Sequence, residues 1–450
     1  MSGEDDAIES LGSIFRGASL FVVGRMVSNI LGVALRLVMT NTLGASPYGV
    51  FAYGIRSVNI LALIGSVGGE KSVMRYVPAD TEKPERRNAT LGVAYGTALV
   101  GSSTAAVGLY LGAPIINALT LNEPVFADAL RVFALLLVPV ALTRVVGNTF
   151  RGIERPEYSI GVQRIAEPAA RLLAVGIGLL LGYTIVGIVG LLAVAVVLVL
   201  ALAGWLLYTH TELRPRFDLA NTDLRDYYNY SLPLTLSAAG GVVYSQVDVF
   251  MIGAFFGSGS VGVYDIALLL AGFLSLPLTA TNQLFPPIAS KLNSENRRAE
   301  LESVFTAVTR WTFSLGLIGG IGLAVYRVEI LSLFGESFPA GATVLALFTA
   351  GYVVNNAVGP SGFLLVMTDH QYVVMANNVV LGVANVALNY VLITEFGFVG
   401  AAIATAGLLA VMNLLRLAEV WYFERLVPYS VAIYKPIVAG IIASGVMIAS

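Results

Sequence analysis

Cysteine is absent from the 450 residues, so the chain forms neither disulfides nor thiolate metal sites. Histidine occurs only at His210 and His370, both at expected helix ends, which argues against a histidine-based metal centre. No glycine is followed directly by lysine, so a Walker A phosphate loop is missing and the protein is not expected to hydrolyse ATP. We therefore predict no catalytic residues, no metal and no cofactor, apart from H⁺ or Na⁺ as a coupling ion.

Charge is also scarce. Charged residues make up 12% of the chain and hydrophobic residues 57%, whereas charged residues usually supply about 25% of a soluble domain. So much apolar surface predicts that most of the chain lies in lipid. The net charge of -2 gives no case for a nucleic-acid partner. A secretory signal begins with basic residues, whereas the first ten residues here are acidic, so we do not expect one.

Apolar runs long enough to cross a bilayer occur about thirteen times. The first bundle is predicted at 14–42, 47–68, 89–112, 125–150, 158–182 and 184–209, and the second at 229–256, 260–284, 302–326, 341–366, 370–393 and 398–423. A further run begins near Tyr434. The predicted divisions are a cytoplasmic segment 1–13, an N-lobe 14–209, a cytoplasmic linker 210–228, a C-lobe 229–424, and a C-terminal linker and helix 425–450.

Basic residues gather in the loops after the even-numbered spans, and positive charge marks the cytoplasmic side. These residues are Lys71, Arg75, Lys83, Arg86, Arg87, Arg151, Arg155, Arg214, Arg216, Arg225, Lys291, Arg297 and Arg298. We therefore predict a multi-pass protein of the cell (plasma) membrane with a cytoplasmic N-terminus. Six spans in each bundle would make the two bundles parallel repeats.

Three pairs of segments indicate an internal repeat. They are Gly44–Phe51 with Gly257–Tyr264 at an offset of 213, Glu123–Phe126 with Glu336–Phe338 at nearly the same offset, and Gly187–Gly190 with Gly397–Gly400 at 210. Paired bundles around a central site are common in secondary transporters. The predicted fold is an all-α polytopic membrane protein, with two parallel six-helix bundles around a central cavity and at least one extra C-terminal helix.

Four stretches resemble the polysaccharide and lipid-linked oligosaccharide flippases (Wzx-like) of the MOP exporter superfamily. They are Leu43–Gly49, Gly68–Tyr76, Leu284–Ala289 and Leu333–Ala342, within a resemblance that runs from about residue 10 to 425. It implies a secondary transporter, not an enzyme, that flips a polyprenyl- or dolichyl-(pyro)phosphate-linked oligosaccharide from the cytoplasmic to the outer leaflet by alternating access. The expected partners are the lipid-linked glycan, membrane lipids and glycan-assembly enzymes, with the protein itself a monomer.

Two alternatives stay open. The related multidrug (MATE) branch exports small molecules with H⁺ or Na⁺, and would favour acidic residues in a cavity within one lobe. A membrane enzyme that polymerises or ligates glycans would need a large outer catalytic loop, and the predicted outer loops are short and nearly uncharged.

Charges inside a span are costly and need a reason. Arg25, Asn29 and Arg36 fall within about 40° of one another at about 100° per residue, and Arg56 lies in the next span. The three arginines predict a ladder of guanidinium groups for the head-group phosphate, which accepts bidentate hydrogen bonds. In related flippases, arginines on these first helices are implied to hold the head group. The alternatives are pairing within the bundle and, for Arg25, snorkelling toward the surface.

Asp248 occupies nearly the repeat-equivalent position of Arg36, and Tyr244 lies one turn earlier on the same face. Three roles are open for Asp248: pairing with Arg36 when the outer gate closes, binding a coupling H⁺ or Na⁺, or a fixed partner within its own lobe. Asp265 is expected at the membrane interface.

Two further sets of polar residues are substrate or gating candidates. Arg164, Glu167 and Arg171 share one face of a span, as an ion network or a phosphate contact. Asn378, Asn385 and Asn389 also share a face, where their amides bond sugar hydroxyls or neighbouring helices.

Overall fold

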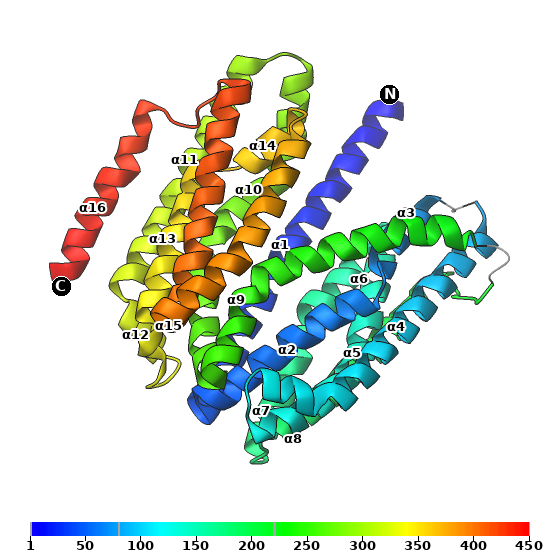
Figure 1. Cartoon of the computed structure of the whole chain (residues 1–450). Helices are drawn as coiled ribbons and strands as arrows, with labels where there is room; N and C mark the ends of the chain where they lie inside the picture. The colour runs from blue at the N-terminus through cyan, green and yellow to red at the C-terminus, as the bar shows by residue number, and fades with distance from the viewer. Residues whose placement is uncertain (1, 80–81, 219–221, 450) are drawn as a thin grey trace. The chain divides into compact units, whose positions relative to one another are not determined.

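The computed structural model describes residues 2–79, 82–218 and 222–449, and side chains there except those of 2–22, 243, 244, 441 and 443–449. Throughout these ranges every regular element is a helix, which confirms the predicted class (Figure 1). The first elements are α1 Ser2–Leu43, α2 Ala45–Gly65, α3 Gly69–Ala79, α4 Pro84–Leu119, α5 Pro124–Gly152, α6 Pro156–Ile160, the π-helix Gly161–Ala166, α7 Glu167–Leu180 and α8 Ile185–His210. They are followed by α9 Leu224–Gly272, the 3₁₀ turn Phe273–Ser275, α10 Leu276–Ser294, α11 Arg298–Val325, α12 Arg327–Ser332, the 3₁₀ turn Phe338–Gly341, α13 Ala342–Val358, α14 Ser361–Met367, α15 Gln371–Glu424, the 3₁₀ turn Val431–Ile433 and α16 Tyr434–Ala449.

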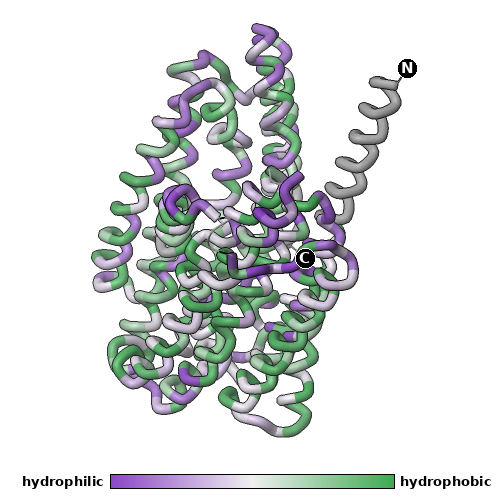
Figure 2. Tube along the Cα trace, turned by 90° about the vertical axis from the view of Figure 1, so that its right-hand side faces the viewer, coloured by the Kyte–Doolittle hydropathy of each residue, from purple (hydrophilic) through white to green (hydrophobic). Residues whose placement is uncertain are grey.

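Within the described residues, nine helical stretches are long and apolar enough to cross a membrane. Apolar residues cover most of the helical tube in Figure 2. Two of the stretches are longer than one crossing needs: Ser245–Ser294 has 50 residues and Gln371–Glu424 has 54. Non-helical backbone at Gly257 and at Gly397 interrupts them. Each predicted run lies on helices of the structure, but the run 158–182, on α6, the π-helix and α7, and the run on α16 are not among the nine stretches, and the number of crossings stays a prediction.

Backbone turns recur at the predicted repeat spacing. Gly44 has φ 81° and ψ -175°, and Gly257, 213 residues later, has φ 77° and ψ -176°. Asn122 and Gly335, also 213 residues apart, both have a positive φ. Gly182 and Gly397, 215 residues apart, both have a positive φ as well. Gly187 lies inside α8, whereas Gly397 has a φ of 65°, so the backbone differs at these two glycines, and the pairing of Gly187–Gly190 with Gly397–Gly400 stays a prediction. These turns support an internal repeat, whose parallel sense stays a prediction.

The helices form two compact units, Met1–Gln246 and Val247–Ser450. Residues 229–246 therefore belong to the first unit, although the sequence placed them in the C-lobe. The reason is the close packing of α9 where it passes the turn before α3: a side chain at Gly68 would lie 2.5 Å from the Ser231 carbonyl oxygen. Near that contact, the Tyr76 hydroxyl donates to an Asp226 carboxylate oxygen at 2.8 Å.

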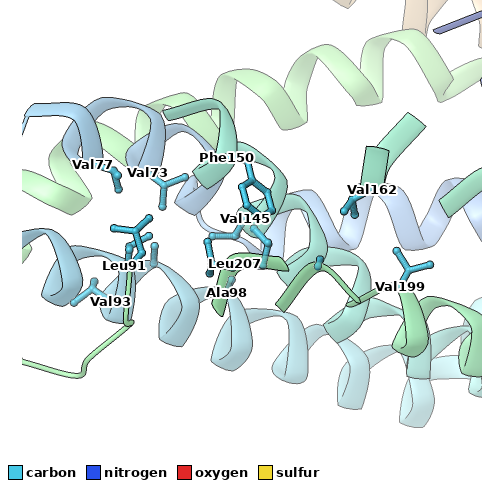
Figure 3. Close-up of a cluster of buried hydrophobic side chains, with 14 of the residues drawn as sticks. Val73, Val77, Leu91, Val93, Ala98, Val145, Phe150, Val162, Val199 and Leu207 are labelled. Carbon is cyan, nitrogen blue, oxygen red and sulfur yellow. The ribbon is translucent and has the colours of Figure 1, made fainter. Parts of the chain in front are cut away.

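A core of aliphatic and aromatic side chains joins α3, α4, α5 and α8 of the first unit. Val73, Leu91, Val145 and Phe150 are fully buried in it (Figure 3). Tyr227, at the start of α9, packs against the same cluster. Removing apolar surface from water stabilises a fold by about 25 cal/mol per Å². Where helices meet outside lipid, such a cluster is therefore the main source of stability.

Candidate functional site in the membrane-spanning helices

Arg36 lies half-buried on α1 and is held by neighbours in its own unit. Its Nε donates to the Tyr48 hydroxyl at 3.2 Å, and its Nη1 donates to the Gly32 carbonyl at 3.2 Å. Tyr48, on α2, is fully buried. These bonds match the alternative of pairing within the bundle, and they also hold the guanidinium in one orientation. Arg25, Asn29 and Arg56 are half-buried too. Whether these residues bind phosphate stays a prediction.

A local change of helix type alters the geometry of the second candidate set. Arg164 lies in the π-helix Gly161–Ala166, so its angle to Glu167 and Arg171 around the helix differs from the α-helical spacing, but the charge of Glu167 still acts on Arg164. Arg171 forms an ion pair with Glu167 one turn away. A side chain at Gly24 on α1 would lie 3.3 Å from Arg164 Cβ, and the charge of nearby Arg25 acts on Arg164. The Glu167–Arg171 part of the set is thus an ion pair, as the network interpretation proposed, and the phosphate contact stays a prediction.

Sequence reasoning missed two charged residues of the first unit. Arg144, on α5, donates to the Asn59 side-chain oxygen at 2.6 Å and to its carbonyl at 3.2 Å. Its place inside the span 125–150 was the signal that would have found it. Glu70, on α3, lies outside the predicted spans, and its Oε1 is buried without a hydrogen-bond partner in the described structure. Burial raises the pKa of Glu70, although the charges of Arg144 and Lys71 oppose this shift.

Asp248 is buried in the second unit with fixed partners. It accepts hydrogen bonds from the Tyr264 hydroxyl at 2.7 Å and from the Thr405 hydroxyl at 3.2 Å. This arrangement matches the interpretation of a fixed partner within its own lobe, while pairing with Arg36 and ion binding stay predictions. The side chain of Tyr244 lies outside the described residues.

Asp265 is only 3% exposed, and the whole stretch Val261–Ala267 of α9 is buried within the second unit. Its position at the membrane interface stays a prediction.

The three asparagines of α15 differ in burial and in partners, and a contact with sugar hydroxyls stays a prediction. Asn385 and Asn389 are buried, and Asn389 Nδ2 donates to the Asn385 side-chain oxygen at 2.6 Å and to Thr405 at 3.5 Å. These two residues therefore join parts of the unit, as the packing alternative proposed. Asn378 is exposed and accepts a 3.2 Å hydrogen bond from Arg416 Nη2. Sequence reasoning missed Arg416, although it lies inside the span 398–423.

Comparison with known proteins gives these residues a context. The family described as "Polysaccharide biosynthesis protein" matches residues 14–292, more than half of the chain. A Haloferax volcanii protein, "Probable low-salt glycan biosynthesis flippase Agl15", is 25% identical over 87% of this chain and 80% of its own length. "Probable flippase AglR" from the same organism is 23% identical over 88% and 81%.

Two solved structures share the fold. "Lipid II flippase MurJ, inward closed conformation" superposes with a TM-score of 0.70 and 14% identity, covering 95% of this chain and 97% of that one. An inward-facing multidrug resistance MATE transporter of the MOP superfamily superposes with 0.68 and 14%, covering 89% and 97%. The chain therefore has the fold of these two transporters.

Proposed function

Because this chain belongs to the polysaccharide biosynthesis protein family, we propose that it is a secondary transporter that flips a lipid-linked oligosaccharide from the cytoplasmic to the outer leaflet. The lipid is a polyprenyl or dolichyl (pyro)phosphate. Both relatives carry the name flippase, and the MurJ structure has the same fold. The observation that carries the proposal is the set of half-buried arginines inside the spans of the first unit, Arg25, Arg36, Arg56 and Arg144.

A lipid-linked glycan presents a charged phosphate that must cross a low-dielectric region. Guanidinium groups bind phosphate oxygens through paired hydrogen bonds, and fixed ones lose little freedom on binding. Arg36 is oriented by Tyr48, and Arg144 by Asn59. Holding arginines at such depth is costly without an anionic substrate or a structural partner.

The same geometry supports a transporter without a chemical step. Binding and release in alternation need only a site exposed to one side at a time. We propose that the protein lies in the plasma membrane and, from the loop charges, that its N-terminus lies in the cytoplasm. We further propose a monomer that receives its substrate from the enzymes that assemble the glycan.

A second candidate function is ion-coupled export of small molecules. The observation that favours it is the buried carboxylate of Asp248, which lies beside the hydroxyl groups of Tyr264 and Thr405. Oxygen ligands of this kind suit H⁺ or Na⁺, and the MATE transporter shares the fold. The arginines of α1 and α2 have no evident use in this function.

The first test is deletion of the gene, with the leaflet position of the lipid-linked oligosaccharide measured by a probe that cannot cross the membrane. Accumulation on the cytoplasmic leaflet, reversed by the intact protein, is the expected result. Normal movement to the outer leaflet would refute the flippase and favour the exporter, for which ion-coupled drug resistance is then measured.

The arginines are tested by Arg36→Ala. We expect normal insertion but export lower by at least about tenfold, since a hydrogen bond to a charged group contributes about 1.5–3 kcal/mol. Arg131→Ala is the matched control, because Arg131 is exposed and paired with Asp128 on the same unit. Equal export by the two variants would overturn the role of Arg36.

A further inference from the structure

Two predicted spans of the second unit are interrupted, and both interruptions border one pocket. The span 260–284 contains the 3₁₀ turn Phe273–Ser275, and the span 341–366 is broken at Gly359 and Pro360, between α13 and α14. Gly359 has a φ of 63°, and a side chain there would lie 2.1 Å from the Thr309 hydroxyl. Irregular backbone inside a membrane is tolerated where it is buried in protein or lines a cavity, and helix breaks often mark transporter binding sites.

The pocket beside these breaks has a volume of about 320 Å³. Ligand sites span roughly 300–1,000 Å³, so it accommodates a group of about the size of a sugar ring. Polar side chains of α10, α13 and α15 line it together with the end of the 3₁₀ turn: Ser275, Thr279, Asn282, Asn355, Asn413 and Arg416. Hydroxyl and amide groups surrounding a single guanidinium are the partners of a ligand rich in hydroxyls that carries one negative charge.

Three structural details favour ligand binding in this pocket. Asn282 lines the pocket, and its side-chain oxygen is buried and accepts no hydrogen bond within the described structure. Gly362 leaves room beside Arg416, because a Cβ there would lie 3.4 Å from the guanidinium carbon. The carboxylate of Glu419, one turn beyond Arg416, accepts hydrogen bonds from Asn377 at 2.8 Å, which holds it on that amide.

We propose that this pocket binds an anionic, hydroxyl-bearing part of the transported head group, with Arg416 contacting the anion and the asparagine amides contacting the hydroxyls. The inference rests on the proposed flippase function, and it assigns a substrate contact to the second unit in addition to the arginines of the first. The anion has two sources, an acidic sugar of the glycan or the phosphate that joins the glycan to lipid. If the basic loops lie in the cytoplasm, the pocket lies in the cytoplasmic half of the spans that line it, which is the side from which the substrate enters.

The absence of cysteine makes a direct binding test available. A single thiol is introduced at the pocket by Ser275→Cys, with Phe363→Cys as a second reporter because Phe363 lines the same pocket and is 41% exposed. The rate of thiol alkylation of the purified protein is measured with D-glucuronate, D-glucose or inorganic phosphate. We expect glucuronate to slow alkylation several-fold, glucose to slow it less, and Arg416→Gln to reduce the glucuronate effect to that of glucose.

Two controls separate the pocket from general effects. Ser332→Cys, exposed on α12, is expected to be alkylated at the same rate with every probe. Arg327→Gln removes an exposed charge from the same unit and is expected to leave protection at Ser275→Cys unchanged. If Arg416→Gln does not elute as folded protein, Asn355→Leu replaces it, and weaker protection by both sugars is then expected.

Each outcome decides the proposal. Arg416-dependent protection by phosphate equal to that by glucuronate supports the site and assigns the anion to the lipid phosphate. Protection that is absent at millimolar probe, or unaffected by Arg416→Gln and Asn355→Leu, overturns it. Because binding is measured without flipping, protection in a protein that fails the leaflet assay would leave the pocket standing while refuting the proposed function. Normal flipping by a protein whose thiol is not protected would overturn the pocket and leave the proposed function standing.

Discussion

Asn356→Leu is expected to destabilise the second unit by disconnecting the interrupted helices that form the pocket. Asn356 is fully buried near the end of α13. Its Nδ2 donates to the Leu274 carbonyl, in the 3₁₀ turn, at 2.8 Å and to the Tyr352 carbonyl at 2.9 Å. The neighbouring Asn355 points into the pocket instead, and its amide makes no hydrogen bond among the described residues. Asn355→Leu is therefore the matched control.

The magnitude follows from two losses. Two hydrogen bonds contribute about 0.5–1.5 kcal/mol each, and contacts between membrane helices lie at the low end of this range. Leucine also adds bulk against Gly316, where a Cβ would already lie 2.6 Å from Asn356 Nδ2. Overpacking of this kind costs about 1–3 kcal/mol. The sum is about 2–4 kcal/mol for Asn356→Leu, against less than about 0.5 kcal/mol for a half-buried side chain without such bonds.

The assay is thermal unfolding of the purified variants in one detergent. Each kcal/mol shifts the Tm by roughly 2–4 °C for a unit of this size. We expect Asn356→Leu to lower the Tm by roughly 4 °C or more, and Asn355→Leu to change it by less than about 2 °C. Equal shifts for the two variants would refute the idea that the Asn356 amide connects the turn to α13.

The remaining predictions concern the first unit. Gly101→Ala should destabilise it by about 1–3 kcal/mol, because the new Cβ would lie 2.2 Å from the Gly65 carbonyl oxygen. At Gly108 a Cβ would meet no atom within 4 Å, so Gly108→Ala should be neutral. Equal Tm values for the two variants in thermal unfolding would contradict this packing. Glu70→Gln should raise the Tm more at pH 7 than at pH 4. Burial raises the pKa of Glu70 above its ordinary 4.5, so the folded state loses stability as the pH rises through this raised pKa. An equal rise in Tm at both pH values would show that neighbouring charges fully offset the cost of burying the carboxylate.

The positions of the helices were predictable because hydrophobicity is a local property of the chain. A run such as 184–209 must be helical in lipid, since its backbone has no water with which to bond, and α8 spans Ile185–His210. The turn at Gly44 was predictable because the residues around it recur at Gly257 in the sequence. Arg36 was identified as a candidate because its charge inside a span is costly wherever its partner lies.

The partners of the polar residues were decided by the tertiary structure alone. Thr405 lies 157 residues from Asp248, and no periodicity within one helix relates two such positions. The π-helix around Arg164 likewise changes the angle between Arg164 and the residues that follow it, which no α-helical periodicity predicts. The sequence by itself determined which segments are helical and where charge is buried, since both depend on composition within one span. Only the packing of distant spans decided that Asn389 bonds Thr405 while Arg416 lines a pocket, because a hydrogen-bond partner is set by the atoms that surround a side chain in space.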